Sequence, residues 1–240
     1  MFKEEFQKFQ LFLEERNYKV ILHIPHVKMD FPKHFFKGLK INVFDLAKYI
    51  FDMTDLYIDK IYKDFKVKKI IPKYSRLYCD VERFKDDNIE DMSKCGQGVV
   101  YTHTYDGTLF HSHDESYKNK VLKYYDKYHN KFNKIVLKEL KKGYNVLILD
   151  CHSFSEEVVS FLRKGSFPDI CIGINDEFVD MDILNYIKNS ILKKGYKYQV
   201  NFPYAGSIIP NIIYDNKDEY CGRVCSIMIE MNKKIYLQKN

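Results

Sequence analysis

The positions of apolar residues along the chain predict helices that alternate with strands. Phe6, Phe9 and Leu13 recur at helical spacing, which indicates an amphipathic helix over residues 3–16. Short apolar runs bounded by turn residues indicate buried strands between further stretches of helical periodicity. We expect those strands at residues 20–24, 69–71, 145–150, 169–174, 196–202 and 224–231, and further helices at 45–51, 55–65, 115–142 and 155–164 and through Leu184, Ile187 and Ile191 up to Gly195.

Capping and turn residues predict where several of these elements begin and end. Asp45 and Asp55 each stand at the expected N-cap of a helix. Gly143 follows the long helix, where a left-handed C-cap is favoured. The Asp-Gly pair at 106–107 predicts the turn of a hairpin over residues 97–110.

Strands that alternate with helices predict an α/β fold, a sandwich of three layers. With 240 residues, 45% of them hydrophobic, and no repeat or linker, we expect a single α/β domain over residues 1–240. No stretch approaches the roughly 20 continuous apolar residues that a membrane span needs. The first ten residues are charged throughout and lack an apolar signal region, which predicts a cytoplasmic protein.

The charge and the cysteines narrow the classes of partner. The net charge of +6 comes from 34 lysines against five arginines, and the lysines are spread along the chain. This distribution favours a solvated surface over a nucleic-acid groove, which would gather basic residues on one face. Six cysteines without a CxxC pair indicate reduced thiols. We therefore expect neither nucleic acid nor a membrane as partner.

Two histidines stand just past apolar runs. His26 follows the predicted strand 20–24, and His152 follows the predicted strand 145–150. Both imidazoles are expected at the carboxyl edge of one sheet, where open α/β folds place their ligand sites. Two neutral imidazoles, one carboxylate and an open position form the usual ligand set of a catalytic zinc ion. The pattern predicts a metal-dependent hydrolase; the alternative is that each is a hydrogen-bonded core histidine.

The residues alone leave the third metal ligand open. Asp150, two residues before His152, is expected on the same strand face. There it either accepts a hydrogen bond from the imidazole or closes the strand. The candidates for the third ligand are four carboxylates elsewhere in the chain: Asp55, Asp59, Glu156 and Glu157.

Two arginines and one glutamate carry further chemistry. Arg76 and Arg83 lie seven residues apart, and a guanidinium can bind a carboxylate or stabilise an oxyanion. The alternative is a structural ion pair with Asp80. Glu230 ends a very apolar strand, where a carboxylate is costly unless it is paired or near a metal. It is therefore a candidate general base, the alternative being an edge-strand residue that faces solvent.

Taken in order, eight segments resemble the N-formylglutamate amidohydrolase family over residues 20–238. No single segment is decisive, and the resemblance rests on their order and spacing. The segments are IPH at 24–26, TDLYIDKIY at 54–62, SRLYCDVERF at 75–84, GQGVVY at 96–101, DCHSF at 150–154, PDICIG at 168–173, NFPYAGSIIP at 201–210 and IMIEMNKKIYL at 227–237.

This resemblance implies a relation to the zinc exopeptidases and aspartoacylases, and so a phosphorylase/hydrolase-like α/β sandwich with a central mixed sheet. It implies one Zn²⁺ per chain, a catalytic glutamate, one arginine that polarises the scissile carbonyl and another that binds the substrate carboxylate. The implied metal ligands are His26, Asp55 and His152, the implied catalytic residues are Glu230 and Arg76, and the implied substrate-binding residues are Arg83, Tyr204 and Gly206.

By the same resemblance, the protein is expected to be a zinc-dependent hydrolase of a linear amide C–N bond that converts N-formyl-L-glutamate to L-glutamate and formate. Val27 and Lys28 stand where the family more commonly has serine or glycine, and Glu82 stands where the related motif has asparagine. These departures concern the identity of the substrate more than the type of reaction. The alternatives are a deacylase or carboxypeptidase-like amidase on another N-acyl amino acid or peptide, and a non-catalytic metal-dependent anion-binding protein.

Overall fold

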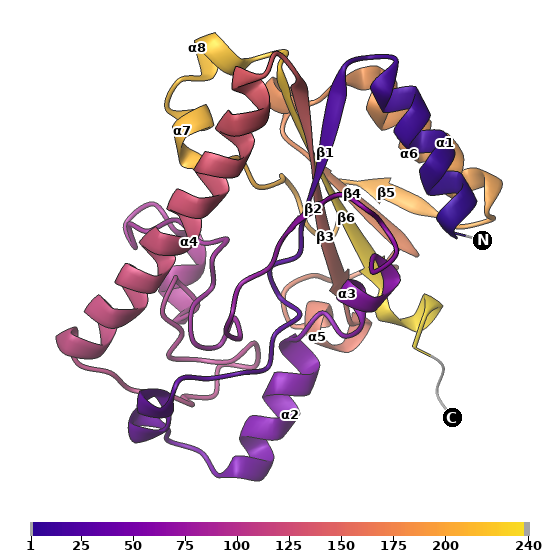
Figure 1. The fold of residues 1–240 in the computed structure, drawn as a ribbon. Coiled ribbons are helices and arrows are strands. Elements are labelled where there is room, and N and C mark those ends of the chain that lie inside the picture. The colour runs from indigo at the N-terminus through magenta and orange to yellow at the C-terminus, as the bar shows by residue number, and fades with distance from the viewer. Residues whose placement is uncertain (1, 238–240) are drawn as a thin grey trace. The chain divides into compact units, whose positions relative to one another are not determined.

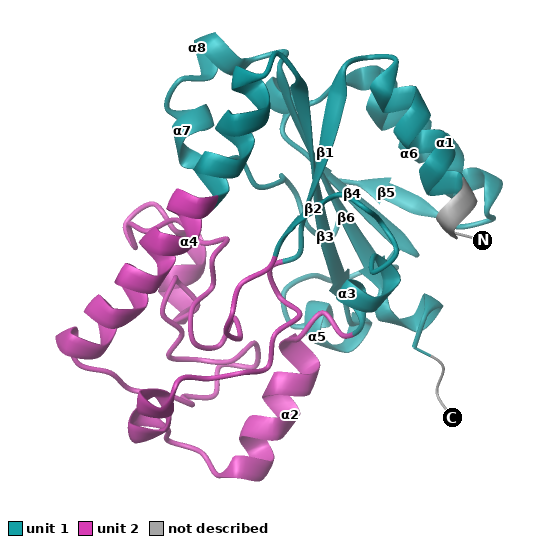
Figure 2. Cartoon of the chain, viewed as in Figure 1, with its two compact units in different colours: residues 1–24, 57–70, 132–240 teal, residues 25–56, 71–131 magenta. Residues whose placement is uncertain are grey.

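The computed structural model describes residues 2–237, and its Cα positions divide the chain into two compact units (Figure 2). Unit 1 comprises residues 1–24, 57–70 and 132–240, and unit 2 comprises residues 25–56 and 71–131. Unit 1 holds the sheet and most of the helices. Unit 2 is built from two excursions of the chain out of unit 1.

A six-stranded mixed sheet forms the centre of unit 1, in the order β2-β1-β3-β6-β4-β5 (Figure 1). The first four of these strands are mutually parallel, whereas β4 runs antiparallel to β6 and parallel to β5. The expected α/β fold with a central mixed sheet is confirmed. The strands are β1 Tyr18–His23, β2 Lys68–Ile70, β3 Asn145–Phe154, β4 Ile170–Ile174, β5 Tyr198–Val200 and β6 Val224–Asn232.

Helices flank this sheet. Helix α1, Phe2–Glu14, packs on β1 and beside α6, Met181–Lys193 (Figure 1). The long helix α4, Glu115–Lys141, begins in unit 2 and ends in unit 1, where Gly143 adopts the predicted left-handed conformation with φ 88°. The short helices of unit 1 are α3 Ile58–Ile61, α5 Glu156–Ser160, α7 Asn211–Tyr214 and α8 Lys217–Tyr220, with 3-10 turns at Asp176–Phe178 and Lys233–Ile235.

Strand β3 extends past the predicted end at Asp150 to Phe154, because β6 pairs with it along that length, up to the register pair Phe154 with Asn232. His152 therefore lies within β3, not after it. Almost every side chain of β3 is buried, as expected for a central strand covered on both faces. This rigid strand positions Asp150 and His152.

Unit 2 has less regular structure. It contains a 3-10 helix η1, Lys33–Gly38, helix α2, Val43–Met53, a second 3-10 helix η2, Asp91–Cys95, and the first part of α4. The predicted hairpin at 97–110 is reduced to isolated bridges such as that between His103 and Leu109. No helix of the described residues is long and apolar enough to cross a membrane.

Two predicted helix caps are wrong. The side chain of Asn42, not that of Asp45, caps α2 by accepting hydrogen bonds from the N–H groups of Phe44 and Asp45. Asp45 lies in the first turn, where its charge still favours the helix N-terminus. Asp55 caps no helix, since α3 begins only at Ile58 after a left-handed residue. Its carboxylate instead faces the imidazole of His26, as described below.

Candidate active site

In unit 2, the chain brings together two residues that were predicted to bind metal, His26 and Asp55. His26 stands two residues past Ile24, and both His26 and Asp55 are buried. The backbone N–H of Asp55 donates to the carbonyl of His26 at 2.9 Å. Nδ1 of His26 lies 3.7 Å from Oδ2 of Asp55. The two side chains thus point at the same small volume.

The other ring nitrogen of His26 identifies its tautomer. Nε2 lies 3.0 Å from Oδ1 of Asp80, and a carboxylate can only accept, so Nε2 carries the proton. Nδ1 then has the lone pair that a metal ion needs. Burial first, and Arg76 second, lower the pKa of His26, which favours the neutral imidazole.

The spacing between His26 and Asp55 fits a shared cation. A hydrogen bond from nitrogen to oxygen spans about 2.7–3.2 Å, shorter than the 3.7 Å between Nδ1 and Oδ2. Two atoms bonded to one tetrahedral zinc ion at about 2.0–2.1 Å lie about 3.3 Å apart. Small side-chain shifts separate the observed distance from that value. A nitrogen and a carboxylate oxygen are also ligand types that zinc accepts.

Asp80 connects His26 to both predicted arginines. Its Oδ2 accepts hydrogen bonds from Arg76 at 2.8 Å and from Tyr101 at 2.7 Å, and lies 3.6 Å from Nε of Arg83. Burial by itself would raise the pKa of this carboxyl, but Arg76, His26 and Arg83 together hold the pKa well below its usual range. Asp80 is therefore an anion inside the protein. Arg76 and Asp80 therefore form the ion pair that was the alternative interpretation of this arginine.

The two guanidinium groups lie close to each other. Nη2 of Arg76 donates to the hydroxyl of Tyr101 at 3.2 Å, and Nη2 of Arg83 reaches the same hydroxyl at 3.4 Å. Nε of Arg83 donates to the carbonyl of Gln97 at 3.1 Å. The side chains are only 19% and 22% exposed. Two positive groups held by one buried carboxylate make a site suited to an anion.

Asp80, Tyr101 and Glu82 lie at the candidate site, and sequence reasoning did not identify them as members of it. Asp80 was considered only as a partner of an arginine, although it lies four residues after Arg76 and three before Arg83, a spacing that indicates shared contacts. Glu82 was noted as a departure from a motif, and its Oε2 lies 3.4 Å from Nε2 of His26. Nothing in the sequence pattern around Tyr101 pointed to its contacts with both arginines.

In unit 1, Asp150 holds two histidines. Its Oδ1 lies 3.0 Å from Nε2 of His152 and 2.8 Å from Nδ1 of His23, and its Oδ2 accepts from the backbone N–H of Ile208. Burial would raise the pKa of Asp150, but His152 and His23 hold it far below its usual range. Of the two roles considered for Asp150, the structure shows the contact with His152, and Asp150 does not end the strand, because β3 continues to Phe154. His152 has the same tautomer as His26, with the proton on Nε2.

Glu230 lies next to His152 in the sheet. The two residues are register partners in β6 and β3, and Glu230 is also opposite Cys171 of β4. Residues directly opposite in neighbouring strands share one face, so the Glu230 carboxylate and the His152 imidazole are on the same side. Glu230 is 7% exposed in an interior strand. Its alternative interpretation as an edge-strand residue facing solvent is wrong.

The predicted substrate residues Tyr204 and Gly206 lie beside β4. The ring of Tyr204 packs against Phe154, and its carbonyl accepts from the Cys171 thiol at 3.2 Å. Gly206 has φ 80°, and its carbonyl lies so close to Gly173 that a Cβ there would clash with it. This close approach fixes the segment against the sheet. Their role in binding substrate stays a prediction.

The other candidate carboxylates have different surroundings. Glu156 accepts hydrogen bonds from Asn232 and Lys234, both at 2.8 Å, on the surface. Glu157 is exposed, and Asp59 is half-buried on α3. Among the described residues of unit 2, the side chains of His26, Asp80 and Glu82 lie close enough together to hold a metal ion.

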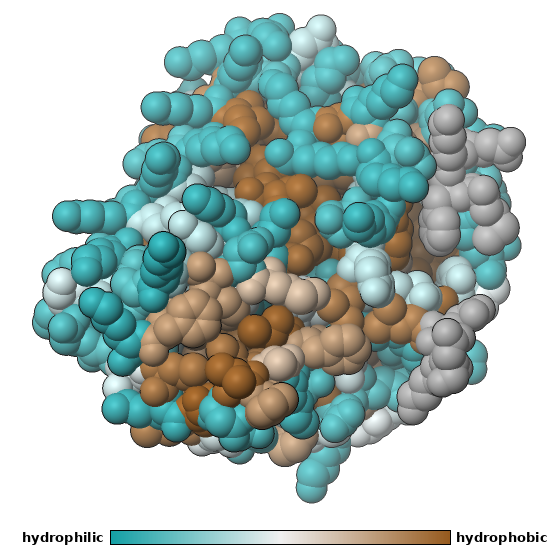
Figure 3. Space-filling view, turned by 60° about the horizontal axis from the view of Figure 1, so that its bottom comes forward, coloured by the Kyte–Doolittle hydropathy of each residue, from teal (hydrophilic) through white to brown (hydrophobic). Residues whose placement is uncertain are grey.

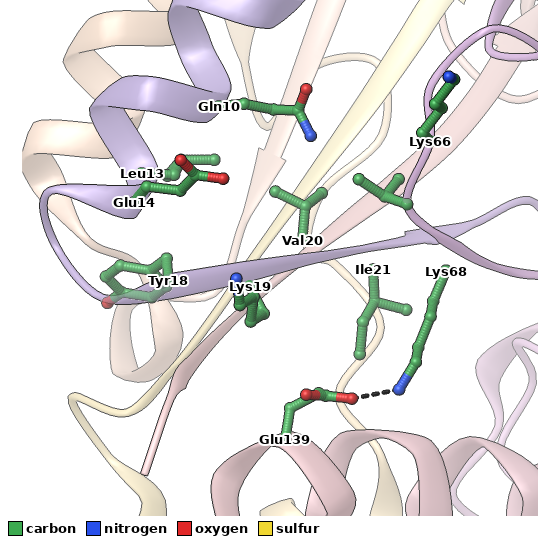
Figure 4. A pocket seen from close by; sticks show the side chains of 11 residues that line it. Gln10, Leu13, Glu14, Tyr18, Lys19, Val20, Ile21, Lys66, Lys68 and Glu139 are labelled. Carbon is green, nitrogen blue, oxygen red and sulfur yellow. Dashed lines mark hydrogen bonds and ion pairs between the residues drawn. The ribbon is translucent and has the colours of Figure 1, made fainter. Parts of the chain in front are cut away.

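A pocket in unit 1 lies away from these residues. It has a volume of about 260 Å³ and is bordered by α1, β1 and residues 66–68, with an ion pair between Lys68 and Glu139 on one side (Figure 4). None of the residues that line it belongs to the predicted site. We therefore do not assign the chemistry to this pocket.

Comparison with known proteins adds a family and a fold. The family model described as N-formylglutamate amidohydrolase matches residues 18–237. The N-formylglutamate amidohydrolase of Ralstonia eutropha JMP134 has a similar structure, with a TM-score of 0.76 and 18% identity over 91% of this chain and 83% of that chain. A gene product of Agrobacterium tumefaciens gives a TM-score of 0.63 and 14% identity over 90% and 79%. No curated protein matches the chain.

Proposed function

Since the chain belongs to the N-formylglutamate amidohydrolase family and is a hydrolase of amide bonds, we propose that it is a zinc-dependent enzyme that cleaves N-formyl-L-glutamate to formate and L-glutamate. The observation that carries the proposal is the arrangement around His26. Its Nε2 donates a hydrogen bond to the buried carboxylate of Asp80. Its Nδ1 lies 3.7 Å from the carboxylate of Asp55. We assign the sandwich to the zinc exopeptidase-like hydrolases on the same basis.

In this proposal, His26, Asp55 and His152 hold the zinc ion. Both histidines carry the Nε2 proton toward a buried aspartate, Asp80 or Asp150, which leaves Nδ1 as the ligating atom. Such carboxylate partners orient a ligating imidazole and raise its basicity. When bound, a zinc ion with an open coordination position supplies Lewis-acid activation and lowers the pKa of water to about 7.

Glu230 acts as the general base and then as the general acid. Its carboxylate takes a proton from the attacking water as the oxygen–carbon bond forms at the amide carbonyl. It then passes that proton to the nitrogen as the C–N bond breaks, so formate and a free amino group leave. The buried position of Glu230 beside His152 in the sheet supports this role.

The arginines recognise charge. Arg76 donates to the oxygen of the scissile carbonyl, on which negative charge develops during attack. Arg83 binds a carboxylate of the substrate, and its link to the Gln97 carbonyl keeps the guanidinium in place. Tyr204 and Gly206 are the residues of unit 1 that we propose to contact the substrate.

Glu82 supports a second candidate substrate class for the same reaction. A carboxylate 3.4 Å from Nε2 of His26 adds negative charge beside Asp80. An acidic substrate side chain would be repelled there, whereas a neutral or basic one would not. Deacylation of another N-acyl amino acid is therefore the alternative to N-formyl-L-glutamate.

The test is metal content together with formate release from N-formyl-L-glutamate, on protein purified without chelators. We expect about one zinc per chain and release that a chelator stops. Bound zinc with turnover of other N-acyl amino acids instead would keep the mechanism and replace the substrate. Bound zinc without turnover of any N-acyl compound would indicate an anion-binding protein. Activity that survives complete removal of metal would overturn the proposal.

A further inference from the structure

Helix α2, Val43–Met53, is apolar on two opposite faces. Leu46, Tyr49 and Met53 are buried. On the other face, Phe44 is 84% exposed and Phe51 is 61% exposed. Among the described residues, nothing covers these two phenylalanines, so the outer face of α2 presents apolar surface to solvent.

The apolar area is large. Figure 3 brings forward the end of the molecule that carries α2 in Figure 1 and shows a broad hydrophobic surface there. A phenylalanine can bury about 150–250 Å², so Phe44 and Phe51 alone offer roughly 300 Å², which already equals a typical largest patch on a monomer. Val43, the first residue of α2, is also exposed, as are Met29 and Phe36, which precede the helix in unit 2.

One charged residue interrupts the outer face, and its charge is paired. Lys48 lies on it, but its ammonium is bound by Asp52 at 2.7 Å and by the hydroxyl of Tyr105 at 2.8 Å. Because one acceptor is a carboxylate, the pair is close to neutral. The face therefore consists of Phe44, the small residue Ala47 and Phe51, beside a compensated lysine.

The spacing of these three residues is self-complementary. Phe44 and Phe51 stand at nearly equal distances in sequence on either side of Ala47, one turn before it and one turn after it. If two such helices pack antiparallel across a two-fold axis beside Ala47, Phe44 of each copy meets Phe51 of the other. The small Ala47 lets the helices approach at the axis, and antiparallel macrodipoles attract. A two-fold interface requires this kind of self-matching patch.

We propose that the outer face of α2 binds a second copy of this chain, forming a two-fold dimer. The exposed apolar residues supply a substantial part of the roughly 800 Å² per partner that a stable interface buries. The flanking lysines agree with the antiparallel arrangement. Lys37 and Lys40 precede α2 and would lie toward the C-terminal end of the other copy's helix, which has no basic residue in its last turn and carries partial negative charge.

Sedimentation equilibrium of the full chain over a range of concentrations tests this proposal. We expect a dimer of twice 28.8 kDa that dissociates on dilution. Phe44→Ser removes two buried phenylalanines per dimer and should weaken the dimer about a hundredfold or more. Leu192→Glu is the matched control, because it puts a charge on an exposed apolar position of α6 and should leave the dimer unchanged.

A charge pair at the axis makes the test specific to two-fold packing of α2. Ala47→Glu and Ala47→Arg should each be monomeric, because like charges meet across the axis. An equimolar mixture of the two variants should restore the dimer. A wild-type chain that stays monomeric at its highest soluble concentration would overturn the proposal. A dimer that survives both Ala47 variants would overturn it equally, because another surface would then hold the copies together.

Discussion

Asp80 fixes the proton of His26: Oδ1 of the carboxylate lies 3.0 Å from Nε2 of the imidazole, with both side chains buried. The second oxygen of Asp80 holds Arg76 and Tyr101. One carboxylate thus sets the orientation of a proposed metal ligand and of a proposed oxyanion-binding group. A change at Asp80 should affect both.

Asp80→Asn should weaken zinc binding about 10- to 100-fold, the usual loss when the carboxylate partner of a ligating histidine is removed. The amide also fails to neutralise the arginines. Zinc affinity is measured by competition with a chelator, and circular dichroism shows whether the variant folds. Glu82→Gln is the matched control: Glu82 is farther from Nε2, at 3.4 Å, and its loss should have a smaller effect. Equal affinities for wild type and Asp80→Asn would contradict the role of Asp80.

Glu230→Gln should lower kcat by about 10²- to 10⁴-fold, the range for loss of a general base, without releasing zinc. The amide keeps the size of the side chain but cannot take a proton. Turnover and metal content are measured on the same sample. Glu156→Gln, a surface carboxylate paired with Lys234, is the control and should leave kcat near wild type. A Glu230→Gln enzyme with normal kcat would show that another residue is the base.

The two arginines should separate in steady-state kinetics. Arg83→Lys keeps the charge but loses the fork that binds a carboxylate by two hydrogen bonds, so KM should rise while kcat changes little. Arg76→Lys weakens a contact to the developing oxyanion and should lower kcat more than it changes KM. Identical effects of the two substitutions would show that the arginines do not have separate roles.

Stability should fall in acid because of Asp80. Its pKa in the folded chain is held well below normal, chiefly by Arg76 against the effect of burial, whereas an aspartate in an unfolded chain has a pKa of about 3.9. A depressed carboxyl stabilises the fold fully above the unfolded pKa, and this contribution is lost as the pH falls below it. Urea unfolding of the metal-free chain should show the loss beginning near pH 4.

Asp80→Asn should make the loss of stability in acid smaller without abolishing it. The pKa of Asp150 is also lowered, by His152 and His23 against the effect of burial, so this carboxylate contributes to the same loss. Asn42→Ala serves as a control: it weakens the cap of α2 and should lower stability by a similar amount at every pH. An acid decline that is unchanged in Asp80→Asn would contradict the assignment.

Much of the fold followed from periodicity, and the errors have identifiable causes. The helix pattern placed α1 and α4, and Gly143 ended α4 as expected. Asn42 and Asp45 are both good capping residues three positions apart, and only the contacts of α2 show that Asn42 accepts the N–H groups. Strand β3 continues beyond Asp150 because its partner strand does, and a pattern within one segment cannot show that.

Part of the candidate site could be proposed from the sequence. Local patterns indicated His26 and the two arginines, whereas Asp55 was one of four candidate carboxylates until the family resemblance selected it. The two-residue spacing put Asp150 on the same strand face as His152, which it contacts. The contacts of Asp80 with His26 and Tyr101 depend on residues 54 positions before it and 21 after it. Such long-range contacts leave no local signal. The buried setting of Asp80, which makes its charge important, is likewise a property of the folded chain.

The hydrogen bond from the Asp55 N–H to the His26 carbonyl, at 2.9 Å, joins the two ends of one excursion of the chain. Residues 27–54 form the segment between the two paired residues, and this segment contains η1 and α2. The segment is also tied to the rest of unit 2, since the N–H of Lys40 donates to the Phe110 carbonyl at 2.8 Å and the N–H of Ser112 to the Gly38 carbonyl at 2.9 Å. A change in the length of this segment therefore has to keep these pairings if His26 and Asp55 are to stay side by side.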